Sequence, residues 1–301
     1  MSLPNDPQWP RAAHWLERAD SNPDLIVLGV PAHETSISPT NAHLTPAAVR
    51  AGLLRYSTFH ITTGHDINDM AVSDAGDVDS PDHFEGELRV ADKVHSLSLR
   101  NDQLLVAIGG DNSITYSVMH ALFGDDLKNA GLITLDAHFD LRDGISNGSP
   151  VRRLIDAGLR GENIVQIGIN DFSNSPAYAA LARDLGIRVI PRSALRTHDI
   201  AEVMRDAIDH LESRVSGIYV DIDVDVCDRS VVPACPAAAP GGLSADELRQ
   251  AAFIAGNSAS VRAIDLTEID ASKDSADERT VRLASLCLLE IAAGRLALRR
   301  Q

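Results

Sequence analysis

Two short segments of this sequence combine acidic residues at a spacing that suggests chemistry. They are Asp136–Asp140 (DAHFD) and Asp221–Asp225 (DIDVD). Side chains two residues apart in a β-strand point to the same face, so each segment is expected to present three polar side chains together. Five carboxylates that converge from two strands repel one another unless positive charge lies between them. The pattern therefore predicts a pair of divalent metal ions; the alternative is that these acids cap helices or form a solvated edge.

The ligand types in these segments indicate which metal would bind. Carboxylate oxygens with a single imidazole suit manganese, whereas sites rich in thiolates select zinc. Asp221 lies further back in its segment, and we expect it to form buried hydrogen bonds rather than to bind metal. The four other aspartates carry four negative charges, which balance two divalent ions, and His138 adds a neutral nitrogen. Two such ions about 3.5–4 Å apart share a hydroxide that is nucleophilic at neutral pH.

Composition limits the class of protein. The 301 residues carry a formal net charge of −16, which argues against a nucleic-acid partner, since phosphate backbones bind basic surfaces. The N-terminus lacks the apolar core of a signal peptide, and no apolar run is long enough to span a bilayer. The three cysteines have no spacing typical of a disulfide framework or a zinc ribbon. These features predict a cytoplasmic protein without a nucleic-acid or membrane partner.

The elements that must position the acids alternate along the chain. Apolar runs rich in β-branched residues predict strands at Leu25–Val30, Leu104–Ile108, Leu132–Leu135, Ile164–Ile169, Ile218–Val226 and Val261–Ile269. Segments with helical spacing lie at Pro46–Tyr56, Ser113–Leu122, Ile200–Leu211, Ser244–Ala255 and Glu278–Leu298. Strands that alternate with helices predict an α/β fold, with one parallel sheet covered on both faces. No linker-like stretch divides the chain, so residues 1–301 are expected to form a single domain.

Polar groups follow four of the predicted strands. They are the two acidic segments, Gly109–Asn112 and Glu268. Ligands of open parallel sheets bind beyond the carboxyl ends of the strands. We therefore expect the four strand ends to converge on one site.

Three motifs resemble those of the arginase–agmatinase (ureohydrolase) superfamily. They are Gly109–Ser113 (GGDNS), Asp136–Asp140 (DAHFD) and Asp223–Asp228 (DVDVCD). The similarity extends over nearly the whole chain. It implies a three-layer α/β/α fold with a parallel sheet of about eight strands, two manganese ions per subunit, and a homo-oligomer, either a trimer or a hexamer. The motifs imply six metal ligands: Asp136 and Asp223 as bridges, His138 and Asp225 at one ion, and Asp140 and Asn112 at the other.

Within the superfamily the sequence is most similar to formimidoylglutamases. Asp136–Arg142, Ser146–Arg152 and Phe172–Ser175 resemble that branch. Arginases and agmatinases usually have a histidine in the loop after D-x-H-x-D, and this chain has none between Asp140 and His198. The resemblance therefore favours N-formimidoyl-L-glutamate over a guanidino substrate.

The implied substrate has two carboxylates, and two arginines could bind them. Arg142 and Arg152 each offer a guanidinium fork that matches a carboxylate. Asn147 lies in the same segment and is a third candidate for substrate binding. For Arg152 the alternative is that it only begins a solvated helix.

The resemblance also implies a mechanism. A hydroxide that bridges the two ions would attack the formimidoyl carbon, and the products would be glutamate and formamide. Asp140 would carry a proton to the leaving amine, and Glu268 would pair with the positive charge of the amidinium group. The alternative for Glu268 is a solvated position in an acid-rich stretch.

One departure from the superfamily affects the metal site. Histidine usually stands where this chain has Asn112, and an amide oxygen is a poorer donor to transition metals than imidazole. We therefore expect the ion near Asp140 to be weakly bound. Two alternatives stay open: a hydrolase of agmatine, guanidinobutyrate or arginine, and a non-catalytic metal-binding or ligand-binding homologue.

Overall fold

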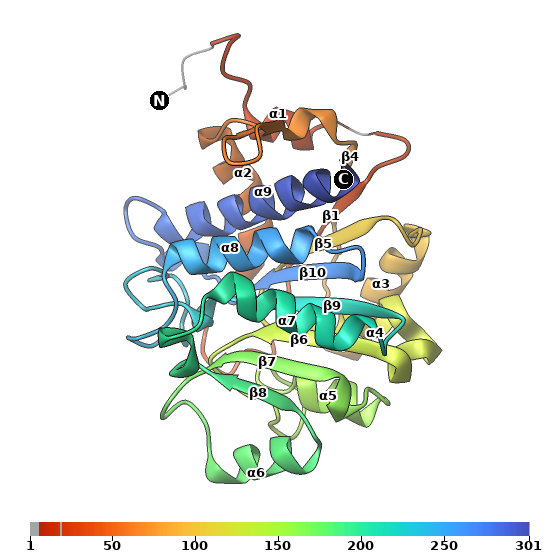
Figure 1. The fold of residues 1–301 in the computed structure, drawn as a ribbon, viewed down its shortest axis with the longest axis vertical. Helices are drawn as coiled ribbons and strands as arrows, with labels where there is room; N and C mark the ends of the chain where they lie inside the picture. The colour runs from red at the N-terminus through yellow and green to blue at the C-terminus, as the bar shows by residue number, and fades with distance from the viewer. Residues whose placement is uncertain (1–5, 19, 301) are drawn as a thin grey trace.

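The computed structural model describes residues 6–18 and 20–300. In this part of the chain, one sheet of eight strands lies between two layers of helices (Figure 1). The strand order is β4-β1-β5-β10-β9-β6-β7-β8, and every neighbouring pair is parallel. The predicted three-layer α/β/α fold with about eight parallel strands is therefore confirmed.

The sheet consists of β1 (Leu25–Val30), β4 (Val72–Asp77), β5 (Leu104–Gly109), β6 (Ala130–Leu135), β7 (Ile164–Ile169), β8 (Arg188–Pro191), β9 (Gly217–Asp223) and β10 (Val261–Thr267). A short antiparallel hairpin is formed by β2 (Phe59–His60) and β3 (His65–Asp66). The α-helices are α1 (Ala12–Leu16), α2 (Thr45–Gly52), α3 (His83–Ser96), α4 (Ile114–Phe123), α5 (Pro150–Asp156), α6 (Pro176–Asp184), α7 (Ile200–Glu212), α8 (Ala245–Gly256) and α9 (Arg279–Arg299).

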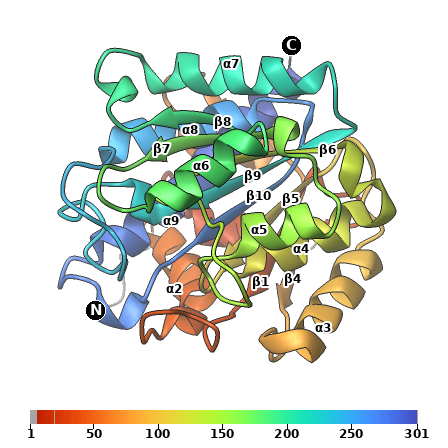
Figure 2. The same cartoon turned by 90° about the horizontal axis from the view of Figure 1, so that it is seen from below.

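Each face of the sheet has its own hydrophobic core. Helices α1, α2, α7, α8 and α9 contribute to one core, and α3, α4, α5 and α6 contribute to the other (Figure 2). Within β1, Val27 belongs to the first core, whereas Ile26 and Leu28 belong to the second, because successive side chains point to opposite faces. Strands buried on both faces have no polar side, which is why the central strands are near-continuous apolar runs.

The two edge strands were not predicted. β4 contains two aspartates and a glycine, and β8 is only four residues long. Both are partly exposed, because an edge strand has a neighbour on one side only. Their short or polar sequences therefore lack the apolar run that identified the central strands.

The longest helix, α9, carries charged residues within its apolar surface. Glu290 accepts hydrogen bonds of 2.6 and 3.0 Å from Arg249 of α8, and Arg295 donates one of 2.9 Å to the carbonyl oxygen of Ser258. These contacts satisfy charges at the α8–α9 interface. No helix in the described part of the chain is long and apolar enough to cross a membrane.

The predicted site residues follow the four central strands, β5, β10, β9 and β6, which are adjacent in the sheet. Beyond β5 the backbone passes close to its neighbours: a Cβ atom at Gly110 would lie 1.8 Å from the carbonyl oxygen of Ala32. Glu268 N donates to the carbonyl oxygen of Gly110 at 2.9 Å. Only glycine permits the approach to Ala32, which follows β1, and the hydrogen bond from Glu268 places the Asn112 turn beside the end of β10.

Candidate metal centre and active site

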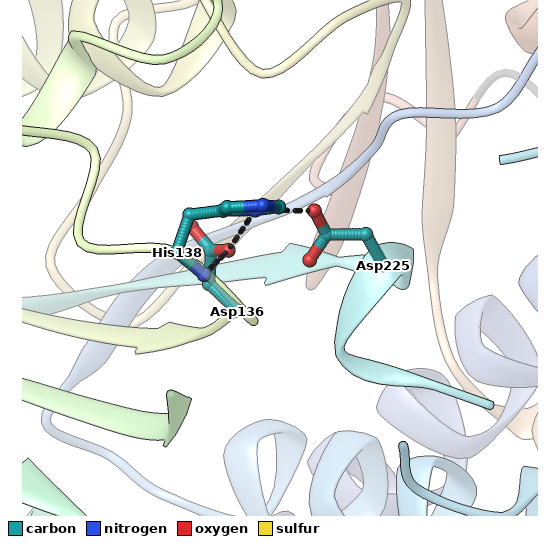
Figure 3. Close-up of side chains that lie close together, drawn as sticks. All are labelled: Asp136, His138 and Asp225. Carbon is teal, nitrogen blue, oxygen red and sulfur yellow. Dashed lines mark hydrogen bonds and ion pairs between the residues drawn. The ribbon is translucent and has the colours of Figure 1, made fainter. Parts of the chain in front are cut away.

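Two strand ends bring an imidazole and two carboxylates together (Figure 3). The potential ligand atoms of Asp136, His138 and Asp225 all lie within 4.8 Å of one another. Nδ1 of His138 lies 2.7 Å from Oδ2 of Asp225 and 3.5 Å from Oδ1 of Asp136. Both aspartates are buried, whereas His138 is partly exposed. The group thus has the donor set of a metal site with one accessible side.

Asp136, His138 and Asp225 lie in turns beyond the strand ends, whereas Asp221 and Asp223 are still within β9. β6 ends at Leu135, and β9 ends at Asp223, where a 3₁₀ turn over Val224–Val226 begins. The strand alternation expected for Asp136–Asp140 is therefore wrong, and that expected for Asp221–Asp225 holds only as far as Asp223. The predicted strand Ile218–Val226 ends three residues too late.

Both acidic segments instead form the same kind of turn. Oδ1 of Asp136 accepts from His138 N at 2.6 Å, and Oδ1 of Asp223 accepts from Asp225 N at 2.8 Å. An aspartate that accepts from the backbone two residues later folds the chain back on itself. The turn places residues i and i+2 on the same side, as a strand would have done.

A second set of contacts holds the two turns together. Ala137 N donates to Oδ1 of Asp225 at 3.0 Å. Asn174 then holds the first turn from the other side: its Oδ1 accepts from Phe139 N at 3.0 Å, and its Nδ2 donates to the carbonyl oxygen of Ala137 at 2.9 Å. Asn174 was not predicted as a site residue, although the resemblance of Phe172–Ser175 to one branch of the superfamily pointed to this loop.

The buried carboxylates attract positive charge. Burial acts to lower the pKa of His138, but Asp136 and Asp225 outweigh it and raise this pKa to about 12. Burial and the neighbouring Asp225 raise the pKa of Asp136 to about 6. Burial also acts to raise the pKa of Asp225, but the His138 imidazolium lowers it below its usual range. The local potential therefore favours a cation.

Two further carboxylates add to this negative potential. Burial and the charges of Asp136 and Asp225 raise the pKa values of Asp140 and Asp223 well above their ordinary value. Oδ2 of Asp136 is buried and has no hydrogen-bond partner among the described residues. A buried carboxylate oxygen without a partner is costly unless a cation binds it. The donor set and this free oxygen fit a divalent metal ion.

Asn112 is oriented differently from a metal ligand. Its Oδ1 accepts from the hydroxyl groups of Thr115 at 2.9 Å and Thr267 at 3.1 Å. Its Nδ2 donates to Oδ2 of Asp140 at 2.6 Å. The amide therefore faces Asp140 with a hydrogen-bond donor, while its only metal-binding atom is held by two hydroxyl groups.

A cavity of about 500 Å³ opens beside the carboxylates. It is lined by seven of the predicted site residues: His138, Asp140, Arg142, Asn147, Asp223, Asp225 and Glu268. Asp136, Asn112 and Arg152 do not line it. Residues that were not predicted also contribute, among them Ser38, Asn174 and Tyr178. The cavity joins the candidate metal ligands to a surface that could hold a substrate.

The two arginines differ in their surroundings. Arg142 is exposed at the cavity, and no hydrogen bond or ion pair of its guanidinium is found among the described residues. Its side chain lies against Gly148, where a Cβ atom would approach Arg142 Cδ to 2.9 Å. Arg152 instead lies 3.3 Å from Asp156 and 3.6 Å from Asp143. Arg142 is thus free to bind an anion, whereas Arg152 already has acidic neighbours.

Glu268 is buried at the inner end of the cavity, with 5% of its surface exposed. Burial and the charge of Asp111 raise its pKa to about 8, although N–H donors from Asn147 and Asn112 oppose the rise. It also has a backbone φ of +66°, which is unusual for a residue other than glycine. A strained, buried acid in a cavity is a candidate to bind a cationic group.

Asp221 lies behind the metal-binding turns and is fully buried. Burial and the charge of Asp265 raise its pKa well above its ordinary value. Asp265 in turn accepts a hydrogen bond of 2.8 Å from Tyr219, and the hydroxyl oxygen of Thr115 also lies 2.8 Å from its Oδ2. Neither Asp265 nor these two partners was predicted, because buried polar residues within apolar segments have no distinct sequence pattern.

Comparisons with known proteins agree with the fold. The model of the Arginase family matches residues 23–294. A formimidoylglutamase from Halalkalibacterium halodurans is 33% identical over 89% of this chain and 86% of its own length. The crystal structure of the Bacillus subtilis formimidoylglutamase is 29% identical, with a TM-score of 0.90 over 98% of this chain and 94% of that one. A Trypanosoma cruzi formiminoglutamase solved with Mn²⁺ shares the fold at 24% identity, with a TM-score of 0.85 over 95% and 98% of the two chains.

The fold and the acidic cluster define an arginase-like α/β protein. The family match spans most of the sequence, and the identity to the Halalkalibacterium halodurans relative extends over almost nine-tenths of it. This chain belongs to the arginase family. The family predicted from the three motifs is therefore confirmed.

Proposed function

We propose that this protein is a formimidoylglutamase, which hydrolyses N-formimidoyl-L-glutamate to L-glutamate and formamide. The observation that carries the proposal is one cavity lined by a carboxylate–imidazole cluster, an unpaired guanidinium and a buried glutamate. The similarity to formimidoylglutamases of two bacteria supports it. We place the reaction in histidine breakdown, as the substrate implies.

The metal would be manganese, held by the acidic turns. His138 and Asp225 would bind one ion and Asp140 the other, with Asp136 and Asp223 as bridges. Oxygen-rich sites with one imidazole suit manganese. Two bound ions would supply a hydroxide that is nucleophilic at neutral pH. Because Oδ1 of Asn112 is held by two hydroxyl groups, we expect the ion beside Asp140 to be bound less tightly.

The substrate would lie between two opposite charges. Glu268 would bind the amidinium end, because a cation beside its carboxyl group favours the ionised form, which balances the positive charge. Arg142 would bind a carboxylate of the glutamate part through its free guanidinium fork. Holding both ends would place the formimidoyl carbon over the metal centre. Arg152, which has acidic neighbours, would contribute less.

Asp140 would donate a proton to the leaving nitrogen. Its pKa is raised, and Asn112 Nδ2 holds its Oδ2 at 2.6 Å. Water adds an oxygen to the formimidoyl carbon, the bond from this carbon to the glutamate nitrogen breaks, and that nitrogen takes up a proton. A carboxyl group beside the reacting carbon can deliver the proton. The products are then glutamate and formamide.

The organisation of the protein completes the proposal. We propose a single domain over residues 1–301 and a cytoplasmic homo-oligomer, a trimer or a hexamer, without nucleic-acid or membrane partners. Size-exclusion chromatography with light scattering would measure the assembly. A monomer would contradict the oligomer but would leave the catalytic proposal intact.

Product release tests the function directly. Manganese-loaded protein is incubated separately with formimidoylglutamate, agmatine, guanidinobutyrate and arginine, and the release of formamide and urea is measured. We expect formamide and glutamate from the first compound and no urea from the others. Urea from a guanidino compound would overturn the substrate, and no turnover of any compound would favour a non-catalytic homologue.

A further inference from the structure

One oxygen of Glu268 is fully occupied by protein donors. Oε1 accepts from the backbone N–H of Asn112 at 2.9 Å and from Nδ2 of Asn147 at 2.7 Å. A carboxylate oxygen has two lone-pair directions, and these two donors fill both. Among the described residues, no donor to Oε2 is found. Glu268 therefore offers a single free oxygen to a ligand in the cavity.

Asn147 makes a second contact that fixes its orientation. Its Oδ1 accepts from the backbone N–H of Ile37 at 3.0 Å. Since the amide oxygen is held by the loop that contains Ile37, the amide nitrogen is directed at Glu268. The loop, the amide and the carboxylate thus form one chain of hydrogen bonds, and a substrate would have to break it to reach Oε1.

A formimidoyl group and a guanidino group differ in the number of NH₂ donors that their terminal ends present to a carboxylate. A guanidinium ion ends in two NH₂ groups, which bind both oxygens of a carboxylate through parallel hydrogen bonds. A formimidoyl group ends in one NH₂ group and has a C–H bond where the guanidinium ion has the other NH₂. When these terminal ends face the carboxylate, one free oxygen satisfies the single NH₂ group of the formimidoyl group. It leaves one buried NH₂ group of the guanidinium ion without a partner.

We propose that Asn147 is a specificity-determining residue, which selects formimidoyl over guanidino groups by keeping Oε1 of Glu268 occupied. The proposal rests on the proposed function. It assigns Asn147 to Glu268 rather than to the substrate. An unpaired buried donor lowers affinity by about tenfold or more, so this arrangement is expected to discriminate by at least that factor.

The test compares two substrates that differ only at the group in question. They are N-formimidoyl-L-glutamate and N-carbamimidoyl-L-glutamate, its guanidino counterpart. For manganese-loaded parent protein and Asn147→Ala, kcat and KM are measured for both compounds. The ratio of the two kcat/KM values is the readout, because general damage to the loop lowers both values and leaves their ratio unchanged. Ser146→Ala is the matched control, since its hydroxyl contacts only the loop itself.

We expect Asn147→Ala to reduce the preference for the formimidoyl compound by about tenfold, while Ser146→Ala keeps the parent ratio. The same ratio in Asn147→Ala and the parent would overturn the proposal, whether or not both rates fall. If the guanidino compound is not turned over by either protein, its inhibition constant replaces kcat/KM, and tighter inhibition of Asn147→Ala is expected. A parent protein without activity on formimidoylglutamate would instead refute the proposed function. Calorimetric affinities of the two compounds would then decide the role of Asn147 by the same ratio.

Discussion

Replacing Asn174 tests whether its two hydrogen bonds hold the metal-binding turn in place. In Asn174→Ala, the buried N–H of Phe139 loses its acceptor, whereas the carbonyl oxygen of Ala137 keeps a 3.0 Å hydrogen bond from Asn170 N. One buried donor without a partner costs about 1–3 kcal/mol. Groups that orient metal ligands from behind typically contribute about 10–100-fold to metal affinity, which is the same range of free energy.

We therefore expect the dissociation constant for Mn²⁺ to rise by about 10–100-fold in Asn174→Ala. Isothermal titration of Mn²⁺ into EDTA-treated protein would measure it. Denaturant unfolding of the metal-free protein would measure how far the substitution lowers the free energy of unfolding before metal binds. We expect a decrease of at most about 3 kcal/mol.

Ser173→Ala is the control for this measurement. Ser173 lies in the same loop and also lines the cavity, but no hydrogen bond of its hydroxyl is found in the described residues. We expect its Mn²⁺ affinity to equal that of the parent. If Asn174→Ala also binds Mn²⁺ with parent affinity, the turn keeps its shape without these bonds and the reasoning is refuted.

Four further predictions concern the metal ligands and the substrate contacts. Asp223→Ala should lose bound manganese and activity together, and full metal content by mass spectrometry would remove its bridging role. Asn112→His should tighten the weaker ion, and an unchanged Mn²⁺ titration would show that position 112 does not contribute. Arg142→Ala should mainly raise KM for formimidoylglutamate, with Arg152→Ala as a milder control, and equal KM values in both would contradict the model of binding. In EDTA-treated protein, burial and Asp225 raise the pKa of Asp136 to about 6. The stability from its bound proton is present below its unfolded pKa and is lost as pH rises through about 6, by about 3 kcal/mol. Asp136→Asn should flatten this decline in denaturant unfolding, and an equally steep decline would refute the assignment.

The central strands and the cluster of candidate metal ligands could be predicted from the sequence because their patterns are local. β5, β6 and β7 are continuous apolar runs, since both of their faces are buried. The acidic segments carry their ligand spacing within a few residues, and it survives whether the segment is a strand or a turn. For this reason candidate ligands from both segments lie together in the structure, although the predicted strand ends were wrong.

The contacts that orient the site could not be predicted in this way. Asn174 and Glu268 lie far along the chain from the groups they contact, and nothing in their own neighbourhood shows which backbone N–H they will meet. The same holds for Thr115 and Thr267, which meet at Oδ1 of Asn112. The packing of the sheet determines which residues make these contacts. In the sequence, an asparagine or threonine that makes such a contact cannot be distinguished from one that does not.

The sequence by itself determined the fold class, the family and the acidic residues that would bind metal, because hydrophobic periodicity and ligand spacing are properties of short segments. Only the tertiary structure decided which arginine is free, which way the amide of Asn112 faces and how many oxygens Glu268 offers. Arg142 and Arg152 are the same residue type and close in the sequence, yet one lies in a loop at the cavity and the other in α5 beside Asp156. The physical reason is that hydrogen bonds and ion pairs depend on distances between atoms from separate segments, and those distances exist only once the strands are assembled.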